Sequence, residues 1–493
     1  MANPIQPTRC SSIPQIQEKS VQIANVVTGS MIVAAALVLT ATGKASAQGN
    51  HPLRAGAAMT DITPKPGELK LKTDTIRDHL FARAIVVDSG DSCAVLIGVD
   101  QGAIRKDMYD AALPRVASAT GCAKENILIA ATHTHSGSTD GFGGAPTSST
   151  IADGIVKAAT DARAKLAPAM IGYGRANVDL NVNRDLFNNK LEWRQEPNPQ
   201  GVSDKTLSVV EFIGADYVPI GIYMNYAMHP INFYLSGVIS ADFPGEASRT
   251  IEEHFDHKTV AIFTQGTSGD QNPSLRENFL TAFRGETAPG TETIAAPPPP
   301  PAPPSNFNPA AASAGLRPVP DQNLAAYRKA IDRTSADVAM MGVLIAEKTL
   351  YLMRHDIKPV SEARIWGGQE KFTCPGRDRL DTDHPVRENA MPPYKDGADV
   401  NLMVSLVRVG DIYFTGINGE VYTNIGLKIK GAAAANKLII STLTNGGANS
   451  GYIYSDDAYS HLSFQVIGSR LKPGCGENKI TDAALELMRK SDR

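Results

Sequence analysis

The sequence lacks three features that would place it in other functional classes. No run of Lys and Arg occurs in its 493 residues, and the formal net charge is only -3. Because nucleic-acid-binding domains carry a clustered basic face, we expect no nucleic-acid partner. No repeat of fixed period is present, so one large domain is the simplest organisation. After residue 47, no apolar stretch has the length of a membrane-spanning helix.

The first 47 residues have the pattern of an export signal. Residues 31–40 are apolar but too few to span a bilayer comfortably, and Ala45-Ser46-Ala47 forms a small-x-small cleavage pattern. We therefore predict a signal peptide over residues 1–47 and an exported protein, either periplasmic or secreted. The segment before Met31 is long and weakly basic, which leaves two alternatives open: Met31 as the true start, or an uncleaved anchor.

Cysteine is scarce. The chain has five, and Cys10 lies in the predicted signal, so the mature chain keeps four, which allow three pairings. Cys93 begins an apolar segment and Cys122 directly precedes the next one, so neighbouring parallel strands would bring the two together. We predict the disulfide Cys93–Cys122 and, by elimination, Cys374–Cys475, both of which require an oxidising compartment. The alternative is four separate buried thiols.

Apolar strand patterns alternate with helical patterns along the chain. Residues 82–88 and 93–99 predict a hairpin, and residues 93–99, 106–118 and 126–132 predict a strand-helix-strand unit with a parallel pair. The fold class we predict is α/β, with mixed β-sheets flanked by helices in one large catalytic domain over residues 48–493. Further helices are expected at 150–166 and 323–352, and further strands at 206–214, 218–226, 259–265, 402–408, 411–417 and 437–443.

One segment inside this domain has a different composition. Residues 286–321 include an unbroken proline run, Pro297 to Pro301, with Ala and Asn around it. Proline lacks an amide hydrogen and fixes its backbone angle, so the segment builds neither a helix nor a sheet. We predict an extended surface loop inserted into the domain. The alternative is a Pro-rich recognition ligand for a partner.

The sharpest local motif is Ala131-Thr-His133-Thr-His135-Ser-Gly137, which follows a predicted buried strand. In α/β proteins, sites are built where strands reach their carboxyl ends. Residues two apart on an extended chain point the same way, so His133 and His135 can aim at one metal ion, or one can bind metal while the other contacts substrate. The other interpretation is two polar residues in an ordinary loop.

Other polar groups also follow predicted strands. His229 precedes Pro230, which ends a strand ladder. Gly266 and Gly269 flank Ser268 in a turn whose backbone amides could hold an oxyanion. Glu420 comes after a glycine turn, and Tyr452 follows a later one. Each of these residues, taken alone, also fits a structural role.

Taken together and in order, these segments resemble the neutral (non-lysosomal) ceramidases. The resemblance spans most of residues 54–465, and the ordered set of motifs is specific for the superfamily but much less so for the substrate. The matching segments are Arg54-Ala-Gly-Ala-Ala-Met-Thr-Asp61-Ile-Thr63, Leu80-Phe-Ala-Arg83, Asp100, Thr132-His-Thr-His-Ser-Gly137, Asn183-Arg184, His229-Pro230, Ala241-Asp-Phe-Pro-Gly245, Ser268-Gly-Asp270, Gly419-Glu420 and Gly451-Tyr452.

The resemblance implies a catalytic zinc ion. Two imidazoles and a carboxylate are a common catalytic set for zinc, which acidifies a bound water and polarises a carbonyl. His135 and Arg184 would stabilise the developing oxyanion or protonate the amine, and Asp270 would shape the turn beside them. The residues that match the family's zinc ligands are His133, His229, Glu420 and Tyr452.

Three departures from the family pattern affect these expectations. Asn272 stands where the family's ceramidases carry a serine, and an amide cannot attack a carbonyl, so we expect Asn272 to orient substrate. A family tyrosine is replaced by Phe464 in a gapless alignment, unless Tyr459 substitutes for it. The family's C-terminal immunoglobulin-like domain has no counterpart before Arg493, so the substrate and any membrane-docking surface stay open.

The resemblance and the site chemistry together predict a zinc-dependent hydrolase. The expected substrate is a small amphiphile with an N-acyl amide bond, ceramide or another acylated amine, cleaved by metal-activated water. A peripheral membrane contact is compatible with such a substrate, and the sequence does not determine the oligomeric state. Two alternatives stay open: a metal-dependent esterase on the same scaffold, or a secreted binding protein that keeps zinc without turnover.

Overall fold

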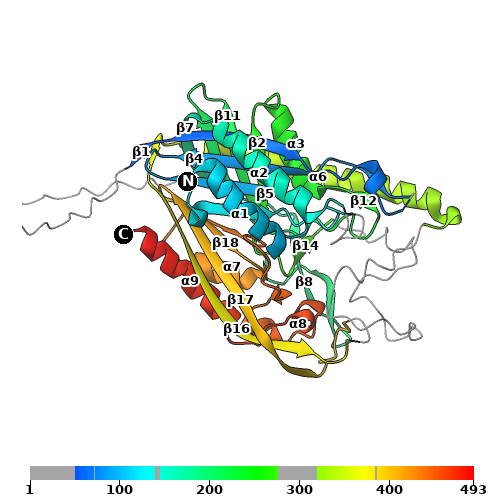
Figure 1. Cartoon of the computed structure of the whole chain (residues 1–493). Coiled ribbons are helices and arrows are strands. Elements are labelled where there is room, and N and C mark those ends of the chain that lie inside the picture. The colour runs from blue at the N-terminus through cyan, green and yellow to red at the C-terminus, as the bar shows by residue number, and fades with distance from the viewer. Residues whose placement is uncertain (1–49, 72, 139–144, 276–318, 383–385) are drawn as a thin grey trace, which may run out of the picture. The chain divides into compact units, whose positions relative to one another are not determined.

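The computed structural model describes residues 50–71, 73–138, 145–275, 319–382 and 386–493. Gln48–Arg493 form one compact unit. Within it, four layers follow one another: helices, an eight-stranded sheet, a four-stranded sheet and further helices (Figure 1). The predicted α/β class, with mixed sheets flanked by helices, is therefore confirmed.

The eight-stranded sheet is mixed, because the pair at each edge runs parallel and the inner pairs run antiparallel. Successive side chains of a strand point to opposite faces. Val86 therefore faces the helices, whereas Val87 faces the second sheet. In spatial order the strands are β13 (Val260–Gln265), β11 (Pro219–Tyr226), β10 (Thr206–Gly214), β7 (Ala167–Asn177), β2 (Arg54–Asp61), β4 (Phe81–Asp88), β5 (Cys93–Val99) and β6 (Ile127–Ala131).

The four-stranded sheet packs one face against the large sheet and the other against helices. Val407 and Phe414 belong to the core between the two sheets, whereas Leu406 belongs to the core under the C-terminal helices. The aromatic rings of Phe414 and Tyr223 meet edge to face across the sheet interface, 5.3 Å apart. The strands are β16 (Ile365–Arg379), β17 (Tyr394–Val409), β18 (Ile412–Ile417) and β20 (Leu438–Ser441).

Helices cover the outer faces of both sheets. Two of them pack on the β2-to-β6 half of the eight-stranded sheet, two on its β10-to-β13 half, and two on the four-stranded sheet. The helices predicted over 106–118, 150–166 and 323–352 are confirmed with small shifts at their ends. The helices are α1 (Lys106–Thr120), α2 (Ser148–Ala164), α3 (Asp242–His254), α6 (Leu324–His355), α7 (Thr423–Ala432), α8 (Phe464–Gly468) and α9 (Gly476–Ser491).

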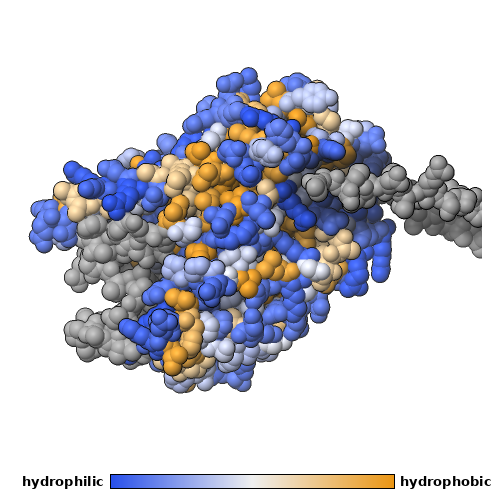
Figure 2. Space-filling view, turned by 180° about the vertical axis from the view of Figure 1, so that it is seen from behind, coloured by the Kyte–Doolittle hydropathy of each residue, from blue (hydrophilic) through white to orange (hydrophobic). Residues whose placement is uncertain are grey.

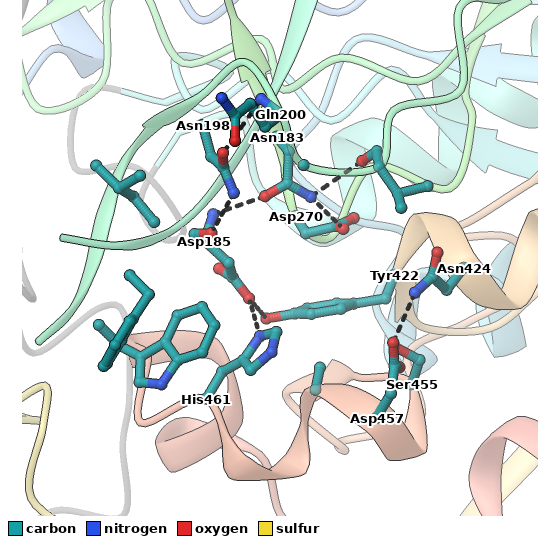
Figure 3. Close-up of a pocket in the computed structure, with 16 residues that line it drawn as sticks. Asn183, Asp185, Asn198, Gln200, Asp270, Tyr422, Asn424, Ser455, Asp457 and His461 are labelled. Atoms are coloured by element: carbon teal, nitrogen blue, oxygen red, sulfur yellow. Dashed lines mark hydrogen bonds and ion pairs between the residues drawn. The ribbon is translucent and has the colours of Figure 1, made fainter. Parts of the chain in front are cut away.

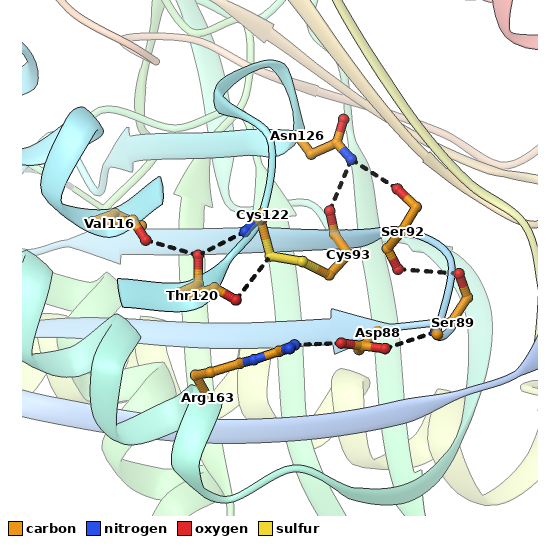
Figure 4. The surroundings of a disulfide bond; sticks show 10 residues. Asp88, Ser89, Ser92, Cys93, Val116, Thr120, Cys122, Asn126 and Arg163 are labelled. Atoms are coloured by element: carbon orange, nitrogen blue, oxygen red, sulfur yellow. Dashed lines mark hydrogen bonds and ion pairs between the residues drawn. A yellow bond between two sulfur atoms is a disulfide. The ribbon is translucent and has the colours of Figure 1, made fainter. Parts of the chain in front are cut away.

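Both predicted disulfides are present. Cys93 and Cys122 are joined with their Cα atoms 5.2 Å apart, and Cys374 and Cys475 with theirs 5.7 Å apart. The first bond links the start of β5 to the chain just before β6, its parallel neighbour (Figure 4). Asn126 supports it from the side, since its amide donates to the Cys93 carbonyl over 2.8 Å. The disulfide therefore fixes the strand-helix-strand unit that leads to the His133 segment.

The long helix α6 leaves part of its surface apolar. Figure 2 shows one face of the molecule, on which hydrophobic areas lie between hydrophilic ones. On α6, four large apolar side chains are 43–46% exposed: Met340, Val343, Leu344 and Tyr351. Among the described residues, no helix combines the length and the apolar character needed to cross a membrane.

Two predicted segments fall largely outside the described residues. The signal peptide predicted over residues 1–47 lies there entirely. Of the Pro-rich loop predicted over residues 286–321, the structure describes the last three residues, and the helix α6 begins shortly after them at Leu324. Both segments therefore stay predictions from the sequence.

Candidate metal centre

The two edges of the large sheet curve toward each other, which brings distant strand ends together. At Gly98 on β5, an added Cβ would lie 2.6 Å from the Cγ2 atom of Ile262 on β13, so only glycine permits this approach. The segment after β20 joins the two edges: Thr442 donates its backbone N–H to Gln265 at the end of β13, and Asn445 donates to Ile129 on β6. The ends of β6, β11, β13 and β18 therefore reach one region.

Three imidazoles and a carboxylate meet in this region. The Glu420 Oε1 atom lies 2.7 Å from His229 Nε2 and 3.3 Å from His133 Nε2. His135 Nε2 lies 3.2 Å from His133 Nε2. Ligand atoms of His133, His135 and His229 all fall within 4.8 Å of one another. The structure thus brings together three of the four predicted zinc ligands, with His135 beside them.

Backbone carbonyls fix the orientation of two of these rings. The Nδ1 atom of His133 lies 2.5 Å from the carbonyl oxygen of Gly102, and Nδ1 of His229 lies 3.0 Å from that of Gln271. A carbonyl accepts only, so each Nδ1 carries the hydrogen and each Nε2 keeps a lone pair aimed at the centre. Such outer hydrogen bonds are the usual support of metal-binding histidines.

The electrostatics of the cluster favour the protonation states that bind a metal. Burial, followed by repulsion from Arg184, lowers the pKa of His229 to about 3. Burial and the neighbouring His133 also lower the pKa of His135 well below its usual value. Burial by itself would raise the pKa of Glu420, but the His133 and His229 imidazoles hold it well below its usual range. These shifts favour neutral imidazoles at His229 and His135 and an ionised carboxylate at Glu420.

Tyr452 reaches the same region through a short strand pair. β19 (Glu420–Val421) pairs in parallel with β21 (Tyr452–Ile453), and Glu420 and Tyr452 are direct register partners. The Tyr452 hydroxyl accepts a hydrogen bond of 3.1 Å from Arg184. The predicted fourth ligand therefore stands beside the carboxylate, at the side where Arg184 enters.

Arg184 extends from β8 (Asn181–Phe187), which is the middle strand of a separate three-stranded sheet with β9 (Trp193–Asn198) and β14 (Gln271–Pro273). It is 3% exposed. Its guanidinium donates to the Gly269 carbonyl over 2.6 Å and to Asn272 Oδ1 over 3.2 Å, and it lies 5.4 Å from the centre of the Tyr452 ring. A positive charge is thus fixed next to the imidazole cluster.

Asp270 lies in a turn that holds the chain segment carrying Glu420. Its carboxylate accepts hydrogen bonds of 2.9 Å from the Asn183 amide and of 2.9 Å from the backbone N–H of Thr423. Gly269 donates to the Val421 carbonyl over 2.8 Å, and an added Cβ at Gly269 would lie 3.0 Å from that residue's backbone. The Gly269-Asp270 turn therefore clamps the chain that carries Glu420, as a positioning element.

The aromatic residue beside Tyr452 is Phe464, whose ring centre lies 6.2 Å away. Tyr459 instead stacks on Tyr454, 6.0 Å away, next to Arg377. The position that carries a tyrosine in the resembling family therefore holds an aromatic ring without a hydroxyl group.

One aromatic residue of this region and two supporting backbone carbonyls were not predicted from the sequence. Tyr234 meets His135 edge to face at 5.1 Å. It lies five positions after His229, in the same strand-end segment, which is the only signal that the sequence offers. The carbonyls of Gly102 and Gln271 have no side-chain signature, so nothing in the sequence marks them.

The donor set fits a divalent metal ion. Three imidazole nitrogens converge in a buried site, and a carboxylate oxygen lies between two of them at hydrogen-bonding distance. Imidazole and carboxylate donors suit zinc and other first-row divalent metals. The arrangement can therefore hold a metal next to a fixed guanidinium and a neutral histidine.

Comparisons with known proteins agree with this geometry. Residues 56–288 match the sequence model of a family described as neutral/alkaline non-lysosomal ceramidase, N-terminal. A neutral ceramidase from Pseudomonas aeruginosa is 30% identical over 269 residues, which make up 48% of this chain and 39% of that relative. The matched part thus spans well under half of the relative's length.

Two solved structures share the fold. The neutral ceramidase of Pseudomonas aeruginosa has a TM-score of 0.62 over 89% of this chain and 75% of its own, at 19% identity. A ceramidase complexed with C2 has a TM-score of 0.63, covering 89% of this chain and 76% of its own, also at 19% identity. Over residues 56–288, the chain is therefore similar in sequence to the neutral/alkaline non-lysosomal ceramidase family, and over most of its length it shares the fold of a neutral ceramidase.

Proposed function

We propose that the protein is a zinc-dependent amidohydrolase that cleaves the N-acyl amide bond of ceramide or another acylated amphiphile. The observation that carries the proposal is the position of Glu420 Oε1 between His229 and His133, at 2.7 and 3.3 Å from their Nε2 atoms. The ceramidase relatives support the amide substrate. We assign His133, His229 and Glu420 as metal ligands, with Tyr452 as the fourth.

The third ligand distinguishes this set from one built on three histidines. His135 also offers its Nε2 atom to the cluster. A carboxylate whose Oε1 atom already lies 2.7 and 3.3 Å from the Nε2 atoms of two imidazoles is the better third ligand, because its charge offsets that of the metal. His135 then contacts the substrate rather than the metal. We therefore propose His135 as a catalytic residue rather than a ligand.

The protein residues divide the chemistry between them. When bound, zinc supplies Lewis acidity and an acidified water molecule. Arg184, fixed by Gly269 and Asn272, stabilises the negative charge that develops on the carbonyl oxygen of the substrate. Burial lowers the pKa of His135, which keeps its ring neutral with an available lone pair. In the proposed reaction this ring accepts a proton from the attacking water and returns it to the leaving amine.

Asn272 limits the mechanism. Its Oδ1 accepts a hydrogen bond from Arg184, and its amide group has no nucleophilic oxygen to attack the substrate. Attack by a side-chain nucleophile at this position is therefore excluded, and the attacking group is water. An ester would be cleaved by the same groups, so the test must separate amide from ester.

The test uses the purified chain and a fluorogenic short-chain N-acyl sphingosine, with the matched O-acyl ester as a second substrate. We expect hydrolysis of the amide, its loss with a chelator, and its return with zinc. Ester hydrolysis alone would replace the amidase assignment with an esterase. A zinc-loaded protein that cleaves neither substrate would contradict both assignments and leave a binding function.

We also propose that the protein is exported after removal of residues 1–47. The small-x-small pattern at Ala45-Ser46-Ala47 and the two disulfides support this proposal. N-terminal sequencing of protein recovered from outside the cytoplasm should give a chain that begins at Gln48. A chain that keeps residues 1–47 would contradict it.

A further inference from the structure

A cavity of about 390 Å³ lies beside β8 (Figure 3). Arg184 on this strand contacts Tyr452 and Asn272, whereas the next residue, Asp185, lines the cavity. Neither Arg184 nor any of the three histidines of the metal centre is among the lining residues. The volume falls within the usual range of small-molecule sites.

Carboxylates outnumber basic side chains in the lining of this cavity. Among the described residues, Asp185, Asp270 and Asp457 line it together with one histidine, and no Lys or Arg does so. Asp185 is 4% exposed, and its carboxylate accepts hydrogen bonds from the Tyr422 hydroxyl at 3.0 Å and the Gln465 amide at 3.2 Å. Buried carboxylates favour a positively charged partner, because a charge removed from water needs compensation.

One titratable imidazole faces these carboxylates. The Nδ1 atom of His461 lies 3.3 Å from Asp185, and its ring stacks on Trp193 at 3.7 Å. The pKa of Asp270 is raised to about 6 by burial and by the nearby charge of Asp185. Two carboxylates thus repel each other across a cavity that has room for a cation.

A buried hydroxyl group also points to a ligand. Ser455 lines the cavity and is 1% exposed, and among the described residues its Oγ atom has no hydrogen-bond partner. Buried hydroxyl groups are normally paired, so an unpaired one in a cavity wall fits a ligand that carries its own hydroxyl. Phe187 and Trp193 add apolar surface to a wall that otherwise includes several amide side chains.

We propose that this cavity binds a small organic ammonium ion that carries hydroxyl groups, that is, an amino alcohol or an amino sugar. The ammonium group would donate to the carboxylates, and a ligand hydroxyl would pair with Ser455. Anionic ligands are disfavoured by the three aspartates. A divalent metal does not fit, because in the described part of the chain the group of side chains close enough to hold one is the histidine cluster. The proposal does not depend on the activity of the metal centre.

The experiment measures binding of serinol (2-amino-1,3-propanediol) to the full chain by titration calorimetry. Glycerol is the uncharged control ligand and glycerol 3-phosphate the anionic one. Asp457→Lys places a cation in the wall at an exposed residue, and Asp153→Lys is the matched charge reversal on α2, outside the cavity. Asp185→Asn is the second cavity variant, with its melting temperature as a folding check.

We expect saturable serinol binding that Asp457→Lys and Asp185→Asn each weaken by about tenfold or more, and that Asp153→Lys leaves unchanged. His229→Ala should keep serinol binding, because His229 does not line the cavity. No saturable binding, equal affinity in Asp457→Lys, tighter binding of glycerol 3-phosphate, or loss of serinol binding in His229→Ala would each overturn the proposal.

Discussion

The Glu420 carboxylate lies 2.7 Å from the imidazole of His229, although 191 positions separate the two residues in the chain. His229 follows a strand of the eight-stranded sheet, and Glu420 follows a strand of the four-stranded sheet. Their contact therefore exists only because the two sheets stack. Packing between the sheets, rather than any local motif, completes the candidate metal centre.

His135→Ala should separate catalysis from metal binding. If His135 moves the proton and does not bind the metal, the variant keeps its zinc and loses about 100-fold or more in kcat. The measurements are kcat and metal content on the same sample. His355→Ala, an exposed histidine at the end of α6, is the matched control and should behave as wild type. Loss of zinc in His135→Ala would make His135 a ligand.

Asn272→Ala should reduce activity modestly. The change removes the hydrogen bond from the Arg184 guanidinium to Oδ1, which leaves Arg184 held by Gly269 and Tyr452. One such bond contributes about 1 kcal/mol, so we expect kcat/KM to fall by about three- to tenfold. A complete loss of activity would show that Asn272 itself takes part in the chemistry.

Glu211→Gln should change how stability depends on pH. Glu211 on β10 is 4% exposed, and burial raises its pKa to about 7. The unfolded chain releases this proton near the ordinary carboxyl pKa, so wild-type stability falls as pH rises from about 4.5 to about 7 and is constant above.

The glutamine variant has no such proton, so its advantage over wild type should grow across the same interval, to the order of 2 kcal/mol at pH 8. Urea unfolding at pH 4.5 and pH 8 measures this difference. Glu362→Gln, an exposed glutamate on β15 (Glu362–Ala363), is the control and should show no such trend. A Glu211→Gln variant whose free energy of unfolding at pH 8 is lower than that of wild type would contradict the account.

Much of the scaffold was predictable because its buried strands are continuous apolar runs. Segments such as Cys93–Val99 and Val260–Gln265 are buried along their whole length, which the sequence shows directly. β9 and β16 were not predicted, because their residues are mostly polar and partly exposed. α3 was missed since Pro244 and Gly245 lie in its first turn, where packing on α6 rather than local preference sustains the helix.

The site was predictable only in part, because only some of its residues directly follow continuous apolar strands. His133, His135 and His229 follow apolar strands, which marks them as residues of the carboxyl edge. Glu420 has no local signature, and its assignment came from the resemblance to a family. The carbonyls of Gly102 and Gln271, which orient two imidazoles, depend on backbone paths that side-chain patterns do not encode.

The central claim is tested most directly by zinc analysis of the purified protein beside His229→Ala and Glu420→Ala. We expect about one zinc ion per wild-type chain and loss of both zinc and amidase activity in each variant, since each removes one of the four proposed protein ligands. Wild-type protein that cleaves the amide without bound metal, or a Glu420→Ala variant that keeps full zinc and activity, would contradict the account.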